Sequence, residues 1–409
     1  MTDHNLLTLP IFAITHAVIA LGEIPFFKID RTGAALAGAV AMVVSGAITE
    51  NAAEHAIDVH TLALLLGMML VVANLRLSGA FALFARAMLA RARSGHGMLA
   101  LTIAASGILA AFFINDVVCI AMTPLVVEAA AAAQVDAVPL LLGLATASNI
   151  GSAATITGNP QNMIVAGFAH LGYTPFLLHL APGAIIGLLV NYAVIAFVYR
   201  ERLTSARLAE LVATRRPRVL RPLLMKSTIV AAAVLVMFML GFPTHLVALA
   251  AGAFLLFTRR VKPARIYALV DWTMLAMFAG LFVVVAGLGS TGFAPTMLRL
   301  VGTQRLTNPV VLTAVVAVLS NLVSNVPAVL LFRPLFPMLG GSHTVALLIA
   351  SASTYAGNLT VVGSIANLIV IEQARYRGVR ISFREYLRVG VPITIATLAI
   401  NTVVLWLWP

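Results

Sequence analysis

The chain has 409 residues, of which 61% are hydrophobic and only 10% are charged, and its mean hydropathy is +1.03. Soluble domains carry about 25% charged residues, so an aqueous surface cannot be built from so few charges. This composition excludes a soluble globular protein and indicates one compact membrane domain. The net charge of +12 does not indicate nucleic-acid binding, because cytoplasmic loops of membrane proteins collect Lys and Arg.

Apolar runs in chain order predict the membrane spans, because a helix needs about 20 apolar residues to cross a bilayer. Two long runs carry a polar cluster at mid-length, FFIND at 112–116 and LVSNVP at 322–327. We expect each of them to enter the membrane, turn and return as a re-entrant hairpin. The sequence therefore predicts an all-α polytopic membrane protein with ten transmembrane helices and two re-entrant hairpins. The runs are 6–24, 33–49, 60–78, 98–133, 139–169, 180–199, 227–241, 244–258, 271–289, 309–338, 344–371 and 389–408.

The distribution of basic residues predicts the orientation. If the loop 200–226 is cytoplasmic, the cytoplasmic loops hold 23 of the 26 Lys and Arg residues, as the positive-inside rule requires. Both termini are then periplasmic, and the protein lies in the inner membrane. The first hairpin enters from the cytoplasm and the second enters from the periplasm. The cytoplasmic loops in this count are 25–32, 76–97, 134–138, 200–226, 259–270 and 372–388.

The two halves of the chain resemble each other. TITGNPQNMIV at 155–165 aligns with TVVGSIANLIV at 360–370, and GMMLVVANLRLSG at 67–79 aligns with GLFVVVAGLGSTG at 280–292. The first hairpin also aligns with the second, at an offset of 210 residues. Each aligned pair has opposite orientation in the charge count, which predicts an inverted repeat of the kind found in secondary transporters. The expected units are a first repeat at 1–199, a basic cytoplasmic linker at 200–226 and a second repeat at 227–409.

Polar residues and a proline interrupt one span of each repeat. In the first, Gly158, Asn159 and Pro160 fall at mid-membrane, where proline and glycine break a helix. The broken ends expose backbone N–H and C=O groups that can bind solute oxygens or a cation. The candidate binding residues at the breaks are Thr157, Gly158, Asn159 and Asn162 in the first repeat, with Asn149 and Gln161 adding amides, and Gly363, Ser364 and Asn367 in the second, with Asn358 and Thr360 nearby. The plainer alternative is a kink stabilised by neighbouring helices.

The hairpin tips supply the other candidate binding residues. Asn115 and Asp116 occupy the first tip, and Ser324 and Asn325 occupy the second. In the plainer interpretation these side chains cap short helices by accepting backbone N–H bonds, which would not exclude contact with a ligand. Two tips that meet two broken helices would enclose a small polar chamber near the bilayer midplane.

Asp116 is the candidate for proton coupling. Carboxyl groups inside a membrane are costly and are by default functional, and desolvation favours the neutral form, which suits a proton carrier. The alternative is an aspartate with a structural role only. Glu54 and Asp58 fall at span ends and are interpreted as solvated, while His16, His179 and His245 are interpreted as packing or interface residues.

Three further features are informative. The segment 79–93 predicts an amphipathic helix on the cytoplasmic surface. The single Cys119 excludes an internal disulfide and a multi-thiolate site. The N-terminus lacks the features of a removable signal peptide, and no HExxH, GxSxG or paired-aspartate motif supports an enzyme. No metal or cofactor is expected.

The motifs SNIGSAATITGNPQNMIV at 148–165, FFINDVVCIAMTPLVV at 112–127 and AGNLTVVGSIANLIV at 356–370 resemble the ion transporter superfamily. The superfamily includes arsenite/antimonite efflux permeases and divalent-anion/sodium symporters. The resemblance implies two inverted repeats, a scaffold domain, a transport domain that moves in an elevator-like manner, and in many members a homodimer. The symporters carry Ser-Asn-Thr at both tips, whereas this chain has Ile-Asn-Asp and Ser-Asn-Val. Its Asn-Asp tip is similar to the arsenite branch, in which proton antiport drives efflux.

Two main functions remain open on the sequence alone. The first is proton-coupled efflux of arsenite or antimonite, whose neutral trihydroxy form suits uncharged amides and hydroxyls. The second is transport of a small inorganic or carboxylate anion, coupled to sodium or protons. A channel is disfavoured because each hairpin blocks one face.

Overall fold

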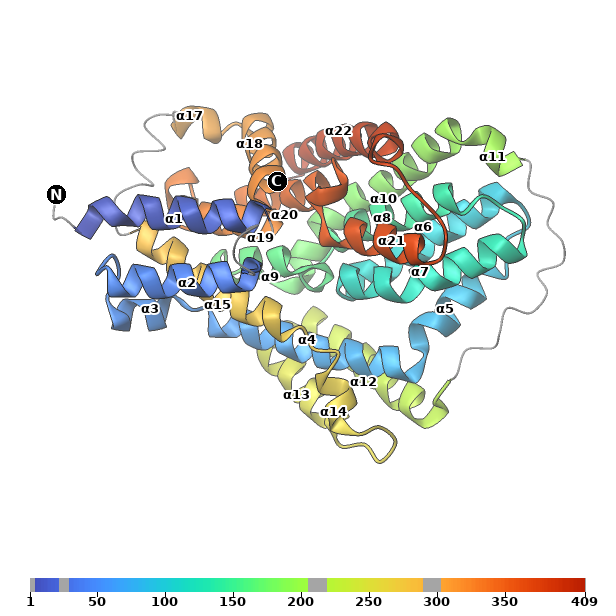
Figure 1. Cartoon of the computed structure of the whole chain (residues 1–409), viewed down its shortest axis with the longest axis horizontal. Coiled ribbons are helices and arrows are strands. Elements are labelled where there is room, and N and C mark those ends of the chain that lie inside the picture. Colours follow the sequence, from blue (N-terminus) through green and yellow to red (C-terminus); the bar gives the residue numbers. More distant parts are fainter. Residues whose placement is uncertain (1–3, 22–28, 205–218, 290–302, 409) are drawn as a thin grey trace.

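The computed structural model describes residues 4–21, 29–204, 219–289 and 303–408, and all regular structure within them is helical (Figure 1). Seven described helices are long and apolar enough to cross a membrane. These are α4 (Val59–Ser78), α6 (Gly95–Phe112), α7 (Asn115–Ala132), α10 (Tyr173–Val198), α12 (Arg221–Met239), α15 (Trp272–Gly289) and α22 (Phe383–Leu407). Shorter apolar helices accompany them, so the number of ten crossings stays a prediction. Residues 205–218 of the predicted linker lie outside the described residues.

The first half begins with two apolar helices and ends with α10. Its helices are α1 (His4–Leu21), α2 (Arg31–Val44), α3 (Glu50–Ala56), α4, α5 (Ala80–Leu89), α6, α7, α8 (Ala137–Ser152), η1 (Ile156–Gly158), α9 (Pro160–Phe168) and α10. Residues 113–114 join α6 to α7, and these two helices pack together as a hairpin. The predicted amphipathic helix is α5, which buries Phe81, Ala85 and Leu89 along one side.

The second half has the same order of elements. Its helices are α11 (Arg200–Thr204) before the linker, then α12, α13 (Thr244–Leu256), α14 (Pro263–Tyr267), α15, α17 (Thr303–Leu306), α18 (Pro309–Val323), α19 (Asn325–Phe332), η2 (Phe336–Leu339), α20 (His343–Ala356), η3 (Val361–Gly363), α21 (Ile365–Tyr376) and α22. The helices α18 and α19 form the second hairpin, and α20, η3 and α21 form the second broken helix. Both predicted helical hairpins and both predicted helix breaks are therefore confirmed.

The two halves pack by exchanging equivalent partners. Helix α13 lies on α4, and α2 lies on α15. A Cβ atom added to Gly67 of α4 would lie 2.3 Å from the backbone carbon of Ala248, and one added to Gly280 of α15 would lie 2.7 Å from the carbonyl oxygen of Ala35. Both pairs of positions differ by 213 residues. The same close helix crossing is therefore built twice, which is what a structural repeat predicts.

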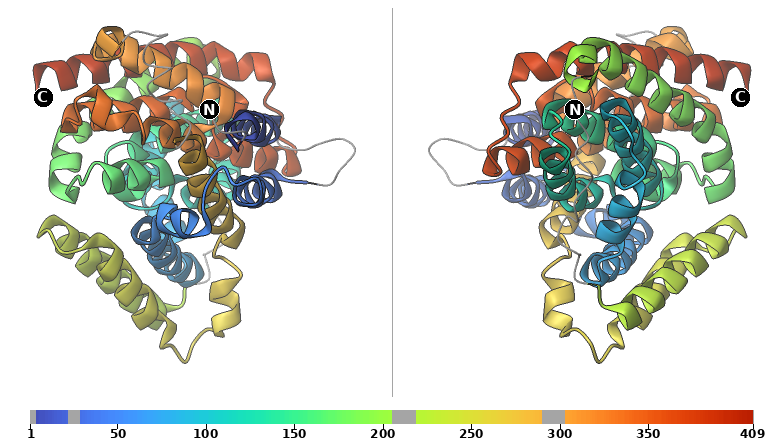
Figure 2. Two further views of the ribbon diagram at one scale, coloured as in Figure 1. Left: turned by 90° about the vertical axis from the view of Figure 1, so that its left-hand side faces the viewer. Right: turned by 90° about the vertical axis from the view of Figure 1, so that its right-hand side faces the viewer.

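The hairpins and broken helices occupy the middle of the molecule. The end views show them between α12, which runs along one lower edge, and α22 on the upper side (Figure 2). The third pair of equivalent elements, α10 and α22, pack directly against each other. Their packing places the two broken helices side by side, with α8 against α21 and α20 against α9.

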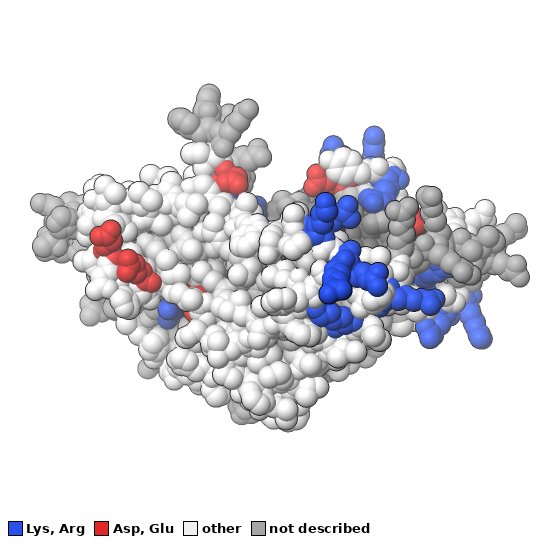
Figure 3. All heavy atoms as spheres, turned by 90° about the horizontal axis from the view of Figure 1, so that it is seen from below, with Lys and Arg blue, Asp and Glu red and all other residues white. Residues whose placement is uncertain are grey.

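Charged side chains are unevenly distributed over the surface. On the face seen from below, most of the visible Lys and Arg side chains gather on the right-hand part, toward the end that carries α5 and α11 (Figure 3). This is the end that the charge count assigns to the cytoplasm. The arrangement agrees with that assignment, and the orientation of the termini remains a prediction.

Candidate functional site

Each helix break is closed by one asparagine. The amide of Asn162 donates to the carbonyl oxygens of Ser152 at 3.0 Å and Thr155 at 2.8 Å. In the second half, the amide of Asn367 donates to the carbonyl oxygens of Gly357 at 2.7 Å and Thr360 at 3.1 Å. Every position in the second set is 205 residues after its counterpart. The amide satisfies carbonyls that the interrupted helix leaves without an intrahelical partner.

The residue at the start of each second half-helix acts as an N-cap. The Asn159 side chain accepts from the backbone N–H of Asn162, and its counterpart Ser364 accepts from that of Ala366. Pro160 follows Asn159 at the first helical turn, where a missing N–H costs nothing. A Cβ atom on Gly158 would lie 2.1 Å from the carbonyl oxygen of Ser152, so only glycine permits this close approach.

Asn149 connects the two halves at the centre of the molecule. Its amide donates to the side-chain oxygen of Asn358 at 2.8 Å and to that of Asn367 at 3.1 Å. Its own side-chain oxygen accepts from Asn115 at the first tip and from Ser364 at the second break, both at 3.0 Å. All four hydrogen-bonding positions of this amide are therefore used. Asn149 holds the first hairpin tip against the second broken helix.

Thr354 makes the equivalent connection from the second half. It lies 205 residues after Asn149, and its hydroxyl accepts from the amides of Asn159 and Gln161, both at 3.2 Å. It also lies 3.3 Å from the side-chain oxygen of Asn162. Sequence reasoning missed Thr354, although the offset of the repeat would have paired it with Asn149.

The tip side chains do not cap their helices, so the capping interpretation is wrong. The N-cap residue of α7 is Ile114 and that of α19 is Ser324, and neither makes a side-chain cap bond. Asn115 instead uses its amide on Asn149. Ser324 has φ +76° and ψ 158°, a left-handed region that non-glycine residues rarely adopt. The chain turns so tightly at this tip that the backbone of Ser324 is strained.

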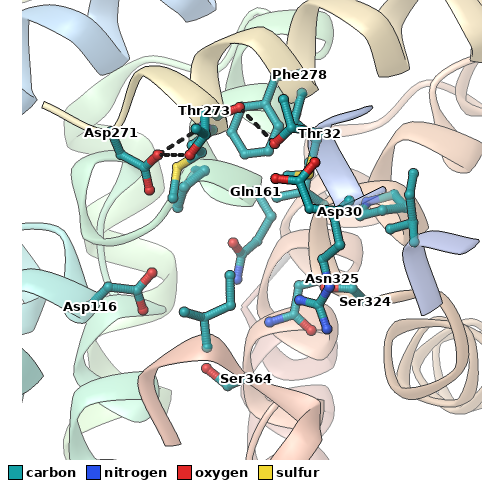
Figure 4. A pocket seen from close by; sticks show the side chains of 18 of the residues that line it. Asp30, Thr32, Asp116, Gln161, Asp271, Thr273, Phe278, Ser324, Asn325 and Ser364 are labelled. Atoms are coloured by element: carbon teal, nitrogen blue, oxygen red, sulfur yellow. Dashed lines mark hydrogen bonds between the residues drawn. The ribbon is translucent and has the colours of Figure 1, made fainter. Parts of the chain in front are cut away.

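Both tips and both breaks border one cavity of about 300 Å³, here called the central cavity (Figure 4). Of the predicted site residues, six line it: Asn115, Asp116, Ser324, Asn325, Gly363 and Ser364. The other five, Thr157, Gly158, Asn159, Asn162 and Asn367, lie behind its wall and are buried. Their polar groups serve the framework: Thr157, for example, bonds with the Tyr173 hydroxyl at 3.1 Å.

The remaining polar wall comes from residues that sequence reasoning assigned to loops. Asp30, Arg31 and Thr32 at the start of α2, and Asp271 and Thr273 at the start of α15, line the central cavity. Thr32 donates to the carbonyl oxygen of Thr273 at 3.2 Å, which joins the two segments. Gln161 also lines the cavity. These helix starts lie at the predicted cytoplasmic membrane boundary, where polar residues are ordinary and gave no signal of a site.

Two polar groups of the central cavity have no partner among the described residues. The carboxyl of Asp116, in the first turn of α7, makes no described hydrogen bond or ion pair, and the side-chain oxygen of Asn325 is likewise unpaired. Asp116 also lines a smaller adjoining cavity of about 150 Å³ with Asp271 and Arg76. By contrast, Asp271 is occupied, because it accepts from Thr273 Oγ1 at 2.6 Å and from the Met274 N–H at 2.9 Å. Asp116 and Asn325 are thus available to a solute.

An apolar all-helical chain with paired hairpins, paired broken helices and a polar cavity between them is a membrane transporter, not an enzyme. Residues 17–339 match the citrate transporter family CitMHS, and the chain belongs to that family, within the ion transporter superfamily. The chain is 29% identical to the silicon efflux transporter LSI3 of Oryza sativa, with 95% of each chain covered. It is 31% identical to an uncharacterized transporter of Mycobacterium tuberculosis (97% of this chain, 98% of the relative) and 24% identical to the transporter arsB of Dictyostelium discoideum (91% and 86%).

Solved transporter structures share the fold. The Alcanivorax borkumensis YdaH transporter aligns with a TM-score of 0.58 and 16% identity, covering 99% of this chain and 98% of that chain. Neisseria gonorrhoeae MtrF aligns with a TM-score of 0.62 and 12% identity, covering 100% and 95%. At these identities the likeness concerns the fold alone.

Proposed function

We propose that this chain exports arsenite or antimonite from the cell in exchange for protons. The observation that carries the proposal is the central cavity, in which Asp116 and Asn325 face a small space from the two opposing hairpins. A trihydroxy metalloid acid is neutral at pH 7 and offers three hydroxyl groups. The free Asn325 oxygen can accept from one of them, and Ser324 and Ser364 can bond to the others.

Asp116 is the proposed proton carrier. Its carboxyl has no described partner that would fix its charge, and it belongs to a hairpin tip at membrane depth, where an acid is costly unless it serves function. In the proposed cycle the aspartate takes a proton from the outer side and gives it up on the cytoplasmic side. The neutral solute leaves in the opposite direction.

The names of two relatives support a hydroxylated metalloid. One is a silicon efflux transporter and another is named arsB, and the hydroxides of silicon and arsenic are both small, neutral and rich in hydroxyl groups. We propose an elevator-like cycle, in which the hairpins and broken helices of repeats 1–199 and 227–409 move as one transport unit. The chain would act in the inner membrane with both termini periplasmic, and a homodimer would supply a fixed scaffold.

The test is arsenite accumulation in cells that lack their own exporter, with and without this chain, at two external pH values. The proposal predicts lower accumulation with the chain present, and a larger reduction at acidic external pH. Equal accumulation with and without the chain would refute arsenite export.

A second candidate is transport of a small inorganic or carboxylate anion. Two observations favour it: the family carries the description of a citrate transporter, and Arg31 lines the central cavity. Uptake of labelled citrate into proteoliposomes, with and without a sodium gradient, separates the two. Sodium-dependent citrate uptake together with indifference to arsenite would favour the anion.

A further inference from the structure

A second and larger cavity lies at the opposite end of the broken helices. It has a volume of about 820 Å³ and is here called the distal cavity. The junction of α3 with α4, the end of α9, the start of α13 and the end of the second hairpin surround it. The charge count assigns these segments to the periplasmic side.

The distal cavity is the repeat counterpart of the central cavity. Asp58 lines the distal cavity and Asp271 lines the central one, and the two differ by 213 residues. Their local roles are also the same. Asp58 accepts from the backbone N–H of Thr61 at the start of α4, as Asp271 accepts from that of Met274 at the start of α15. The chain thus presents the same helix starts to two different compartments.

One contact pair changes its chemistry between the two cavities. In the central cavity Thr32 of α2 touches Thr273 of α15. At the same positions plus 213, His245 of α13 stacks on His60 of α4, with ring centroids 4.2 Å apart. Two hydroxyls in one compartment are therefore replaced by two imidazoles in the other. Sequence reasoning interpreted His245 as a packing residue; it packs, and it also faces the distal cavity.

The distal cavity also contains a cation without a carboxylate partner. Arg333, at the end of the second hairpin, is partly buried and donates to the carbonyl oxygen of Ala56 at 3.2 Å. Its guanidinium lies over the Phe282 ring, 5.5 Å from the centroid. In the part of the chain that the structure describes, no carboxylate lies within ion-pair distance of it. A guanidinium held in this way presents its remaining donors to an anion.

The ionisable groups that face the cavity reverse its charge with pH. They are the acids Glu54 and Asp58, the cation Arg333, and the histidines His55, His60, His170 and His245. Their formal charge is −1 with every imidazole neutral and +3 with every imidazole protonated. Histidine changes its charge between about pH 5 and 8, so the cavity favours anions on the acidic side of that range.

We propose that the distal cavity binds a small oxyanion through Arg333 and the His60–His245 pair, and that binding strengthens as the pH falls. Arg333 supplies the permanent charge and a bidentate donor fork. The protonated histidines add donors from the opposite wall. The proposal concerns a site separate from the central cavity and does not depend on which solute the transporter carries.

The test uses the full chain purified in detergent, with radiolabelled sulfate in equilibrium dialysis at about pH 5.5 and about pH 8. Sulfate stays a dianion across this range, so any change in affinity belongs to the protein. We expect saturable binding of one sulfate at the lower pH, with affinity at least about tenfold weaker at the higher pH. No saturable binding at the lower pH would overturn the proposal.

Three variants assign the binding to these residues. Arg333→Gln should abolish sulfate binding, and Arg333→Lys, which keeps the charge, should retain a weakened site if the first variant does not fold. The double variant His60→Gln, His245→Gln should remove most of the pH dependence. His179→Gln, the same change at a histidine outside the cavity, is the matched control and should bind as the parent does. Unchanged binding in Arg333→Gln, or unchanged pH dependence in the double variant, would contradict the assignment.

Discussion

Asn149 and Thr354 hold equivalent places in the two halves, and each bonds to the two residues that close the helix break of the other half. Asn149 bonds to Ser364 and Asn367, and Thr354 bonds to Asn159 and lies beside Asn162. All these side chains are buried. A polar network this deep is tolerated only when its members are paired. It makes the centre of the transporter a rigid frame around which the hairpin tips are arranged.

The amides that close the breaks should stabilise the fold. Asn162→Ala leaves the buried carbonyl groups of Ser152 and Thr155 without that donor, and an unpaired buried polar group costs about 1–3 kcal/mol. We therefore expect the free energy of unfolding to fall by about 2–5 kcal/mol, with a similar fall for Asn367→Ala. Thermal unfolding in detergent measures the loss. The exposed Asn51→Ala is the control, and an equal effect in all three variants would contradict this role.

Asp116 should be needed for coupling but not for folding. Asp116→Asn removes the ionisable group without breaking a described hydrogen bond, so we expect pH-driven transport to be lost and the unfolding temperature to be unchanged. Asp271→Asn should instead cost about 0.5–2 kcal/mol, because Asp271 caps the start of α15. Transport in proteoliposomes across an imposed pH gradient, together with thermal unfolding, separates the two roles. Unaltered transport by Asp116→Asn would remove this residue from the mechanism.

The close crossing of α4 and α13 should tolerate no side chain at Gly67. A Cβ atom there would lie 2.3 Å from the Ala248 backbone, so Gly67→Ala must separate the helices. Overpacking typically costs about 1–3 kcal/mol, and the yield of folded protein should fall. Gly280→Ala should act in the same way, whereas Gly289→Ala, which meets nothing within 4 Å, should behave as the parent does. Equal yields of Gly67→Ala and Gly289→Ala would show that the crossing is not tight.

The strained backbone at the second tip gives an opposite prediction. Ser324 adopts φ +76°, which glycine accepts readily, and such strain costs about 1–3 kcal/mol. Ser324→Gly should therefore raise the unfolding temperature, while Ser324→Ala should not. Both variants lose the hydroxyl that faces the central cavity, so both should weaken solute binding. A Ser324→Gly variant less stable than Ser324→Ala would show that the tip is not strained.

The sequence predicts the elements well because their signals are local. Hydropathy, the polar clusters at 112–116 and 322–327, and the Gly-Asn-Pro interruption each act within one segment, and the hairpins and breaks lie where they predict. The internal alignment also indicates which segments are equivalent. The matched packing of Gly67 on Ala248 and of Gly280 on Ala35 agrees with it.

The composition of the cavity wall could not be predicted in the same way. Whether Asn162 faces the solute or the framework depends on which partner its amide meets, and its partners lie across the break. Asp30 and Asp271 reach the cavity only because α2 and α15 pack together. Their polarity is ordinary at a span end, so the residues themselves carried no signal. Five of the eleven predicted site residues consequently proved to be framework.

The most direct test of the account is whether the first hairpin tip and the second helix break meet at one place. Asn115 and Ser364 donate to the same oxygen of Asn149, so cysteines at these two positions should be joined by a short membrane-permeant bifunctional thiosulfonate in a Cys119→Ala background. Intact mass should show one internal cross-link, and transport should stop and then recover on reduction. Two thiols that each react with a monofunctional reagent but never cross-link would contradict the account.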